Sequence, residues 1–350
     1  MTGKRLRIAV AGAGMIGRRH IGLISQSDVC ELAAIIDPAP AAREIVGTAR
    51  APLLATLAEL FAREKPDGVI VATPNNLHLE HGFACVAAGV PALIEKPLAD
   101  TIEAAERLCA AAEAAKVKLL TGHHRQHSTI MAKAVEVVRS GRLGRIVAVV
   151  GTALYYKPDS YFDDAPWRRQ PGGGPILINL IHEIGNLRAL CGEIAAVQAI
   201  ASNAVRGHQV EDSAAIGLRF VSGALATFAL SDTAASGRSW EQTSQEDKSF
   251  PAYPDEDCYI VAGTEASLAV PTMRLKRFGK TAERSWWTPL ESETIAIDRA
   301  DPLQRQLENF CAVIRGEAQP VVTAHDGLQN LRVIDAIKKA ARDGANVSLT

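Results

Sequence analysis

The chain has 350 residues, 47% of them hydrophobic, which is enough for about two domains with separate cores. Its 38 Lys and Arg residues nearly balance its 39 Asp and Glu residues, so it lacks the strong net field that would attract nucleic acid or an anionic membrane. No apolar run approaches the ~20 residues that span a bilayer. We therefore expect neither a nucleic-acid partner nor a membrane partner.

The six cysteines are scattered along the sequence, and none of them forms a C-x-x-C pair with another. This pattern argues against a zinc site or a disulfide framework and favours a reducing compartment. The N-terminus enters an apolar run within a few residues, which leaves no room for a signal peptide. We expect a cytoplasmic protein that holds no metal.

The first predicted elements are a strand over Leu6–Ala11 and a helix over Met15–Gln26. Gly12, Gly14 and Gly17 join them in a G-x-G-x-x-G turn. In such a turn the first glycine permits the tight bend, the second lets a pyrophosphate approach the backbone, and the third lets helix and strand pack closely. The sequence therefore predicts a dinucleotide site.

An acidic residue follows at the expected spacing. The next predicted strand, Ala33–Asp37, ends in a carboxylate that can accept hydrogen bonds from both hydroxyls of an adenosine ribose. The N–H groups at the helix start, at Met15 and Ile16, face the phosphates. Residues 38–40 contain no Arg or Ser that could hold a 2′-phosphate, which favours NAD over NADP.

Strands and amphipathic helices then alternate, as in a parallel sheet covered on both faces. The further strands are predicted over Gly68–Thr73, Val90–Glu95 and Val117–Thr121, and the helices end near Ala88 and cover Thr101–Ala115.

Ligands of such sheets bind at the carboxyl ends of the strands, and polar residues gather there in the sequence. Besides the glycine turn and Asp37, the expected cofactor contacts are Thr73, Pro74, Asn75, His78, Glu95, Lys96 and Arg125. Lys96 could instead be a solvated surface charge. We expect Pro97 to fix a bend that aims the ammonium of Lys96 into the site. A cis peptide bond before Pro97 is one way to form that bend. Glu95 either faces the pocket or pairs with Lys96.

The second half of the chain is rich in Val, Ile, Thr and Phe, and its short runs are separated by Gly, Asn and Ser turns. Such runs predict an open, mostly antiparallel sheet. Strands are expected over 145–153, 195–201, 214–220, 224–230, 257–263 and 266–270, with a hairpin at 263–266. Helices are expected over 128–140, 302–315 and 326–341, and a mobile loop over 238–254.

The predicted fold class of the whole chain is therefore α/β plus α+β. A doubly wound Rossmann domain covers 1–122, and a substrate and oligomerisation domain covers 123–350, with a C-terminal helix able to pack back on the first.

A glycine run, Gly172–Gly174, precedes an apolar helix that carries Asn179, His182 and Asn186 on one face. A lone histidine on such a helix is more often a core residue. The flexible loop before it and the polar neighbours favour a functional role.

Hydride transfer needs a base for the hydroxyl proton and a donor for the developing alkoxide. His182 titrates near neutrality and suits the first role, and Lys96 suits the second. The charge of Lys96 also favours a neutral imidazole nearby.

Aromatic and arginine residues cluster before the glycine run, where they wall a sugar-sized pocket or form an interface. The residues expected to contact substrate are His124, Tyr155, Trp167, Arg168, Asn179 and His182.

Five motifs together resemble the glucose–fructose oxidoreductase/inositol dehydrogenase/rhizopine catabolism (Gfo/Idh/MocA) family. They are Gly12–Gly17, Thr73–His78, Glu95–Pro97, Gly144–Ile146 and Gly172–Gly174 leading to His182. The resemblance spans both halves of the chain. It implies a homodimer or homotetramer, and a substrate that is a sugar, a cyclic polyol or a related alcohol. It also implies that Lys96 and His182 form the catalytic pair.

Three positions depart from that family pattern. Many members carry an Asp four residues before the His, where this chain has Ile178, and many carry an acid three residues after it, where this chain has Gly185. His124 also stands where an Asn often precedes the Arg. Lys96 and His182 alone would then carry the acid–base work.

The missing acid leaves two alternatives open besides a dehydrogenase. One is a cofactor-sensing regulatory or binding protein without turnover, since a fold does not fix a function. The other is an enzyme in which transient oxidation serves an elimination, as in NAD-dependent glycosidases.

Overall fold

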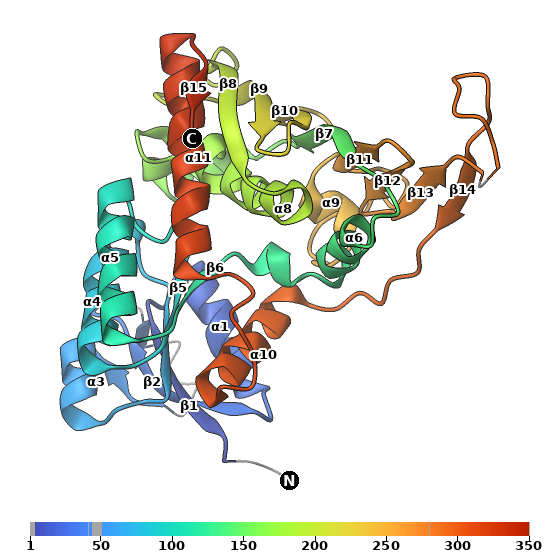
Figure 1. The fold of residues 1–350 in the computed structure, drawn as a ribbon. Coiled ribbons are helices and arrows are strands. Elements are labelled where there is room, and N and C mark those ends of the chain that lie inside the picture. Colours follow the sequence, from blue (N-terminus) through green and yellow to red (C-terminus); the bar gives the residue numbers. More distant parts are fainter. Residues whose placement is uncertain (1–3, 41, 44–50, 280, 350) are drawn as a thin grey trace. The chain divides into compact units, whose positions relative to one another are not determined.

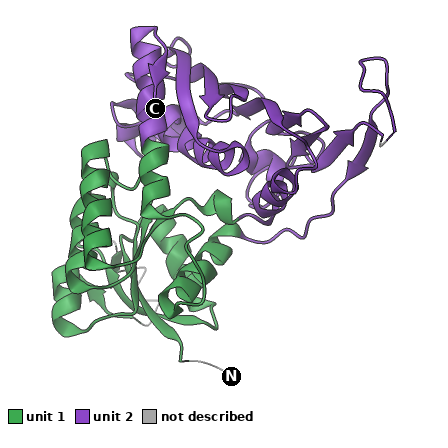
Figure 2. Ribbon diagram, viewed as in Figure 1, with its two compact units in different colours: residues 1–127, 302–331 green, residues 128–301, 332–350 purple. Residues whose placement is uncertain are grey.

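The computed structural model describes residues 4–40, 42–43, 51–279 and 281–349. The chain divides into two compact units, of which unit 1 comprises Met1–His127 and Pro302–Leu331, and unit 2 comprises Ser128–Asp301 and Arg332–Thr350 (Figure 2). Each unit has its own hydrophobic core.

Unit 1 is built, over its described residues, on a six-stranded sheet in the order β3-β2-β1-β4-β5-β6 (Figure 1). Its strands are β1 (Leu6–Ala11), β2 (Cys30–Ile36), β3 (Leu53–Leu54), β4 (Gly68–Val71), β5 (Ala92–Glu95) and β6 (Leu119–Gly122). All neighbouring pairs are parallel. Strands β4, β5 and β6 are buried at every residue because helices cover both faces. The predicted Rossmann sheet is confirmed.

Two helices of unit 1, α3 and α5, begin at a threonine that caps them. Thr101, for example, accepts a hydrogen bond from the N–H of Ala104 at 3.1 Å and starts α5. The described elements are α1 (Met15–Ser25), α3 (Leu57–Arg63), η1 (Asn75–Leu77), α4 (His78–Ala88), α5 (Ile102–Ala115), η2 (His124–His127) and α10 (Pro302–Arg315). From far along the sequence, α10 packs beside α1 and contributes Phe310 to the core of unit 1.

Unit 2 contains, in its described part, a nine-stranded sheet in the order β14-β13-β12-β11-β7-β10-β9-β8-β15. The strands are β7 (Ile146–Leu154), β8 (Ile194–Ser202), β9 (Ser213–Phe220), β10 (Leu225–Ser231), β11 (Tyr259–Gly263), β12 (Ala266–Val270), β13 (Arg274–Arg277), β14 (Glu291–Thr294) and β15 (Val347–Ser348). The pair β7–β10 is parallel and the other pairs are antiparallel. This confirms the open, mostly antiparallel sheet and the hairpin between β11 and β12, whereas β13, β14 and β15 were not predicted.

Helix α8 (Ile181–Cys191) is buried along most of its length in unit 2. A single π-helical turn, η4 (Ile176–Leu180), precedes it, so the helix expected after the glycine run has two parts. The remaining helices are α6 (Thr129–Arg139), α7 (Asp159–Asp163), η3 (Pro166–Arg169), α9 (Trp240–Ser244) and α11 (Ala324–Asp343), the last shared between the units.

The segment expected to be a mobile loop, 238–254, contains α9. Its residue Trp240 is only 3% exposed and stacks on Tyr259 with ring centroids 6.0 Å apart. Trp240 and the buried polar residues Thr243 and Ser244 therefore order part of a polar stretch. None of the described helices has the length and apolar character needed to cross a membrane.

Candidate active site

The glycine turn of unit 1 combines two enforced glycines with one that faces open space. Gly12 has φ +93°, and a Cβ there would lie 2.5 Å from the carbonyl oxygen of Ala72. A Cβ on Gly17 would lie 2.0 Å from the carbonyl oxygen of Gly12. A Cβ on Gly14, at the N-terminus of α1, would meet no heavy atom within 4 Å. The turn thus keeps free the space that a pyrophosphate needs at a helix N-terminus.

Asp37 follows β2, and backbone N–H groups hold its carboxylate in place. Its Oδ2 accepts from Ala13 and its Oδ1 from Ala39, each at 2.8 Å. A cavity of about 380 Å³ opens beside it, of a size that suits an adenosine. The cavity is lined by Asp37, Pro38, Ala39, Pro40, Arg43, Leu53, Leu54 and Ala55. These residues and the turn fit an NAD molecule.

His78 braces two of the strand-end loops. Its Nδ1 lies 2.7 Å from the carbonyl oxygen of Pro97, and its Nε2 lies 2.9 Å from that of Thr73. The ring is 1% exposed, and burial lowers its pKa, partly opposed by the two carbonyls. His78 therefore fixes the bend that carries Lys96, and the Lys96–Pro97 bond is cis as anticipated.

The carboxylate of Glu95 lies under this bend, buried at 5% exposure. Its Oε1 is 2.8 Å from Nε2 of His20, a fully buried residue of α1. It packs on Gly122, where a Cβ would lie 2.8 Å from the carboxyl carbon. The pairing of Glu95 with His20 was not anticipated from the sequence.

His124 and Arg125 lie on η2, directly after β6. Arg125 is 3% exposed. Burial holds the pKa of His124 well below its usual value, and the charges of Arg125 and Lys96 lower it further. A neutral His124 next to these cations is therefore the resting form at neutral pH.

In unit 2 two residues of the glycine run, Gly173 and Gly174, lie too close to neighbouring atoms for a larger residue. A Cβ on Gly173 would lie 2.5 Å from the carbonyl oxygen of Arg168. Gly174 has φ +80°, and a Cβ there would lie 2.6 Å from Oε1 of Glu211. That same oxygen accepts a hydrogen bond from the N–H of Ile176 at 2.8 Å. Glu211 thus caps the helical stretch that carries His182.

His182 lies in the first turn of α8 and is 6% exposed. The buried side chains of Glu183 and Asn186, on the same helix, both bind the hydroxyl of Tyr259, the latter at 3.0 Å. The polar residues expected on one helix face therefore have different partners. Asn186 connects the helix to β11. Asn179 instead accepts a hydrogen bond from Lys157.

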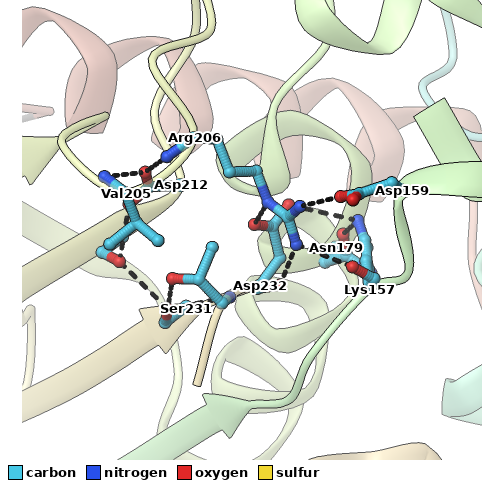
Figure 3. A network of polar contacts seen from close by, with 10 residues as sticks. Lys157, Asp159, Asn179, Val205, Arg206, Asp212, Ser231 and Asp232 are labelled. Carbon is cyan, nitrogen blue, oxygen red and sulfur yellow. Dashed lines mark hydrogen bonds and ion pairs between the residues drawn. The ribbon is translucent and has the colours of Figure 1, made fainter. Parts of the chain in front are cut away.

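Asn179 belongs to a polar network at the end of β7 and β10 (Figure 3). Its Oδ1 accepts a hydrogen bond from Nζ of Lys157 at 2.7 Å. The same ammonium lies 3.9 Å from Oδ2 of Asp232, whose Oδ1 accepts from Nε of Arg206 at 2.8 Å. Lys157 was not singled out from the sequence.

The aromatic cluster is organised around Tyr161. The guanidinium carbon of Arg168 lies 3.8 Å from its ring centroid, and Nη1 of Arg168 donates to its carbonyl oxygen. Trp167 is 48% exposed, and Tyr155 is half-buried. Arg168 is therefore held by stacking on Tyr161.

Comparison with known proteins agrees with both halves of this description. Residues 6–123 match the model of the Gfo/Idh/MocA oxidoreductase family with an NAD-binding Rossmann fold, and residues 135–349 match its C-terminal alpha/beta domain. The chain belongs to the Gfo/Idh/MocA oxidoreductase family. It is an NAD-dependent dehydrogenase acting on CH–OH groups.

The family relatives have varied names. The 1,5-anhydro-D-fructose reductase of Ensifer adhaerens is 32% identical over 290 residues, covering 82% of this chain and 80% of that protein. The rhizopine catabolism protein MocA of Rhizobium meliloti is 27% identical over 342 residues, covering 95% and 94%. The WlbA dehydrogenase of Chromobacterium violaceum, solved with NADH and UDP-GlcNAcA, superposes with a TM-score of 0.81 at 27% identity, covering 100% of this chain and 97% of that one.

Three side chains near the Gfo/Idh/MocA motifs escaped the sequence argument. His20 follows the last glycine of the turn by three residues, and Arg43 follows Asp37 by six, so both had a local signal. Lys157 is 22 residues from Asn179, and no spacing in the sequence links the two. Only the folded sheet brings them together.

Proposed function

We propose that the chain moves a hydride between NAD(H) and a secondary alcohol or ketone of a sugar, a cyclic polyol or a related diol, with Lys96 and His182 as its electrostatic and acid–base pair. Several relatives act on such compounds by name, among them a 1,5-anhydro-D-fructose reductase and an inositol 2-dehydrogenase. The observation that carries the proposal is the almost buried imidazole of His182, on a helical stretch whose start is capped by Glu211.

The residues divide the work of alcohol oxidation. Bound NAD supplies the hydride acceptor. An imidazole nitrogen of His182 takes the proton from the substrate hydroxyl, and the ammonium of Lys96 stabilises the negative charge that develops on that oxygen. In ketone reduction the same groups act in the opposite direction, and His182 gives the proton back to the substrate oxygen. Asp37, the glycine turn and Arg125 bind the cofactor, and His124, Tyr155, Trp167, Arg168 and Asn179 contact the substrate.

The arrangement of each residue supports its role. Lys96 stands at the carboxyl end of β5, on a bend that His78 holds through Pro97. Parallel sheets bind their ligands at this end of the strands. His182 needs a constant orientation to act as a base, and Glu211 and Tyr259 fasten its helix on either side of it.

The proposal is tested by incubating the protein with NAD and a panel of polyols, or with NADH and 1,5-anhydro-D-fructose, while following NADH absorbance. We expect turnover by the wild type. The His182→Ala variant should lose about 10²–10⁴-fold in kcat while its NADH affinity is unchanged. Full activity in that variant would remove His182 from the mechanism.

Ile178 stands where many family members have an acid, and this leaves two other functions open. The same assay distinguishes them from a dehydrogenase. A regulatory protein would bind NADH tightly and turn over no alcohol. An oxidation–elimination enzyme would form product from a glycoside with no net change in NADH.

We further propose that the protein is a cytoplasmic homodimer or homotetramer. The sheet of unit 2 supports association because strands β7, β10 and β11 carry exposed apolar side chains. These are Val147, Val150, Leu225 and Ile260, exposed at 39%, 50%, 57% and 39%. Light scattering of the purified protein would measure the mass.

A further inference from the structure

The main chain of Lys157 is fixed on both sides, just beyond β7. Its N–H donates to the carbonyl oxygen of Asp232 at 2.9 Å. Its own carbonyl oxygen accepts from Nη2 of Arg206 at 2.8 Å. Arg206 is in turn held by Asp232 through Nε. The position from which the lysine side chain starts is therefore set by backbone and side-chain bonds together.

The ammonium of Lys157 is also held, and Figure 3 shows it directed at Asn179. Its side chain is 11% exposed, with Nζ 2.7 Å from Oδ1 of Asn179 and 3.9 Å from Oδ2 of Asp232. Nζ lies 4.5 Å from the ring centroid of Tyr161. Burying an ammonium is costly unless it is paired, and here an amide oxygen, a carboxylate and an aromatic face share it.

This contact determines which way the Asn179 amide faces. An ammonium only donates, so the amide must present its oxygen to Lys157 and direct its NH₂ group elsewhere. Asn179 is half-buried and lies in the π-helical turn that leads into α8, three residues before His182. Asn179 is therefore a fixed donor in a stretch where many family members carry a proton-accepting acid.

We propose that Lys157 is a positioning residue that makes Asn179 a hydrogen-bond donor to an oxygen of the substrate other than the reacting one. The substrate accordingly carries a second hydroxyl or carbonyl oxygen besides the group that is oxidised or reduced. This inference rests on the proposed function, because it places the substrate beside His182.

The variant Asn179→Asp separates this role from a structural one. An aspartate keeps the shape and a strong partner for Lys157, yet it replaces the donor by an acceptor. Lys157→Met removes the ammonium at similar length, and Lys133→Met, at an exposed lysine paired with Glu136 in the same unit, serves as the control. All variants are assayed in the full-length protein with NADH and 1,5-anhydro-D-fructose.

We expect Asn179→Asp to keep its melting temperature and NADH affinity while KM rises about tenfold or more. Lys157→Met should raise KM similarly, and Lys157→Met combined with Asn179→Ala should be no worse than Asn179→Ala alone, since the two residues act as one unit. Lys133→Met should match the wild type. A KM within about twofold of the wild type for Asn179→Asp, or multiplying effects in the double variant, overturns the proposal.

A second readout does not depend on turnover. The side-chain amide resonance of isotope-labelled Asn179, identified by its loss in Asn179→Asp, should shift when the sugar is added to the NADH complex, and not in Lys157→Met. Absence of a shift in the wild type at saturating sugar contradicts the inference. A shift without turnover contradicts the proposed function, while the orientation of Asn179 by Lys157 and its contact with a bound sugar are still supported.

Discussion

The cofactor turn of unit 1 and the His182 helix of unit 2 are built in different ways. The turn is formed by backbone atoms. Gly12 and Gly17 are required there because carbonyl oxygens lie only 2.5 Å and 2.0 Å from the positions that their Cβ atoms would occupy. The helix is held by side chains from three separate segments, at Glu211, Lys157 and Tyr259. A site formed by the backbone accepts few residue types, so it can be recognised as a sequence motif. A site held by side chains from separate segments has no fixed residue spacing by which it could be recognised.

The largest effect expected from this difference is at Gly17. Gly17→Ala should lower NADH affinity more than about 100-fold and destabilise the protein by about 3 kcal/mol, because the new methyl group collides with the carbonyl oxygen of Gly12. Isothermal titration with NADH and urea unfolding measure the two effects. Gly22→Ala on the same helix is the control, since its Cβ would meet nothing within 4 Å. It should be neutral or stabilising, and equal behaviour of the two variants would refute the packing argument.

A smaller loss is expected at Asp37, where the proposed cofactor contact is a side chain. Asp37→Ala should weaken NADH binding about 10–100-fold, since the ribose hydroxyls lose a charged acceptor. The preference for NADH over NADPH should shrink in the same titration, because repulsion of a 2′-phosphate disappears. Asp37→Asn, which keeps an acceptor without the charge, should lose the discrimination and keep more of the NADH affinity. An unchanged NADH to NADPH ratio would rule out this role.

Acid should act on unit 1 first. Burial lowers the pKa values of His78, His124 and His127, that of His127 to about 4, so these rings stay neutral in the folded state. The unfolded chain takes up protons below about pH 6.5, so stability falls from there towards the folded pKa values by about 1.4 kcal/mol per pH unit for each ring. In unit 2, burial instead raises the pKa values of Glu211 and Asp232 and so opposes acid destabilisation.

Urea unfolding between about pH 7 and about pH 5 measures this slope. His127→Gln should reduce it by one proton, or about 1.4 kcal/mol per pH unit. A variant with the slope of the wild type would show that His127 is not neutral in the folded protein.

The smallest effect is expected at the helix cap. Glu211→Ala leaves the N–H of Ile176 without its acceptor and should lower the free energy of unfolding by about 1 kcal/mol. Glu211→Gln retains an acceptor oxygen and should keep most of the stability. Circular dichroism during urea unfolding compares the two. If both variants are equally destabilised, the charge of Glu211 matters and the cap does not.

Much of the fold was predictable from local pattern. Strand β1, helix α10 and strand β12 have the predicted bounds, because apolar runs bordered by Gly or Pro define them. The short strands β13, β14 and β15 escaped prediction because β13 and β14 consist mostly of charged or polar residues and β15 has only two residues. Helix α9 escaped because its buried residues, apart from Trp240, are the polar Thr243 and Ser244, which give no apolar pattern.

The candidate site divides in the same way. The tight turn at Gly12 and Gly17 and the cis bond before Pro97 follow from local sequence, and the structure shows both. Contact of the turn and of Asp37 with a cofactor stays a prediction. The pairings of Glu95 with His20 and of Asn179 with Lys157 join residues 75 and 22 positions apart. Only strand order and loop geometry decide such pairings, so residue spacing does not predict them.

The most direct test of the account is a double-variant cycle on kcat, with Lys96→Met, His182→Asn and their combination, each checked for unchanged NADH affinity. The proposed mechanism has both groups act on one substrate oxygen, so it predicts that each single variant loses about 10²–10⁴-fold and that the double variant loses little more. Independent, multiplying losses, or a single variant that keeps wild-type turnover, would contradict the pair.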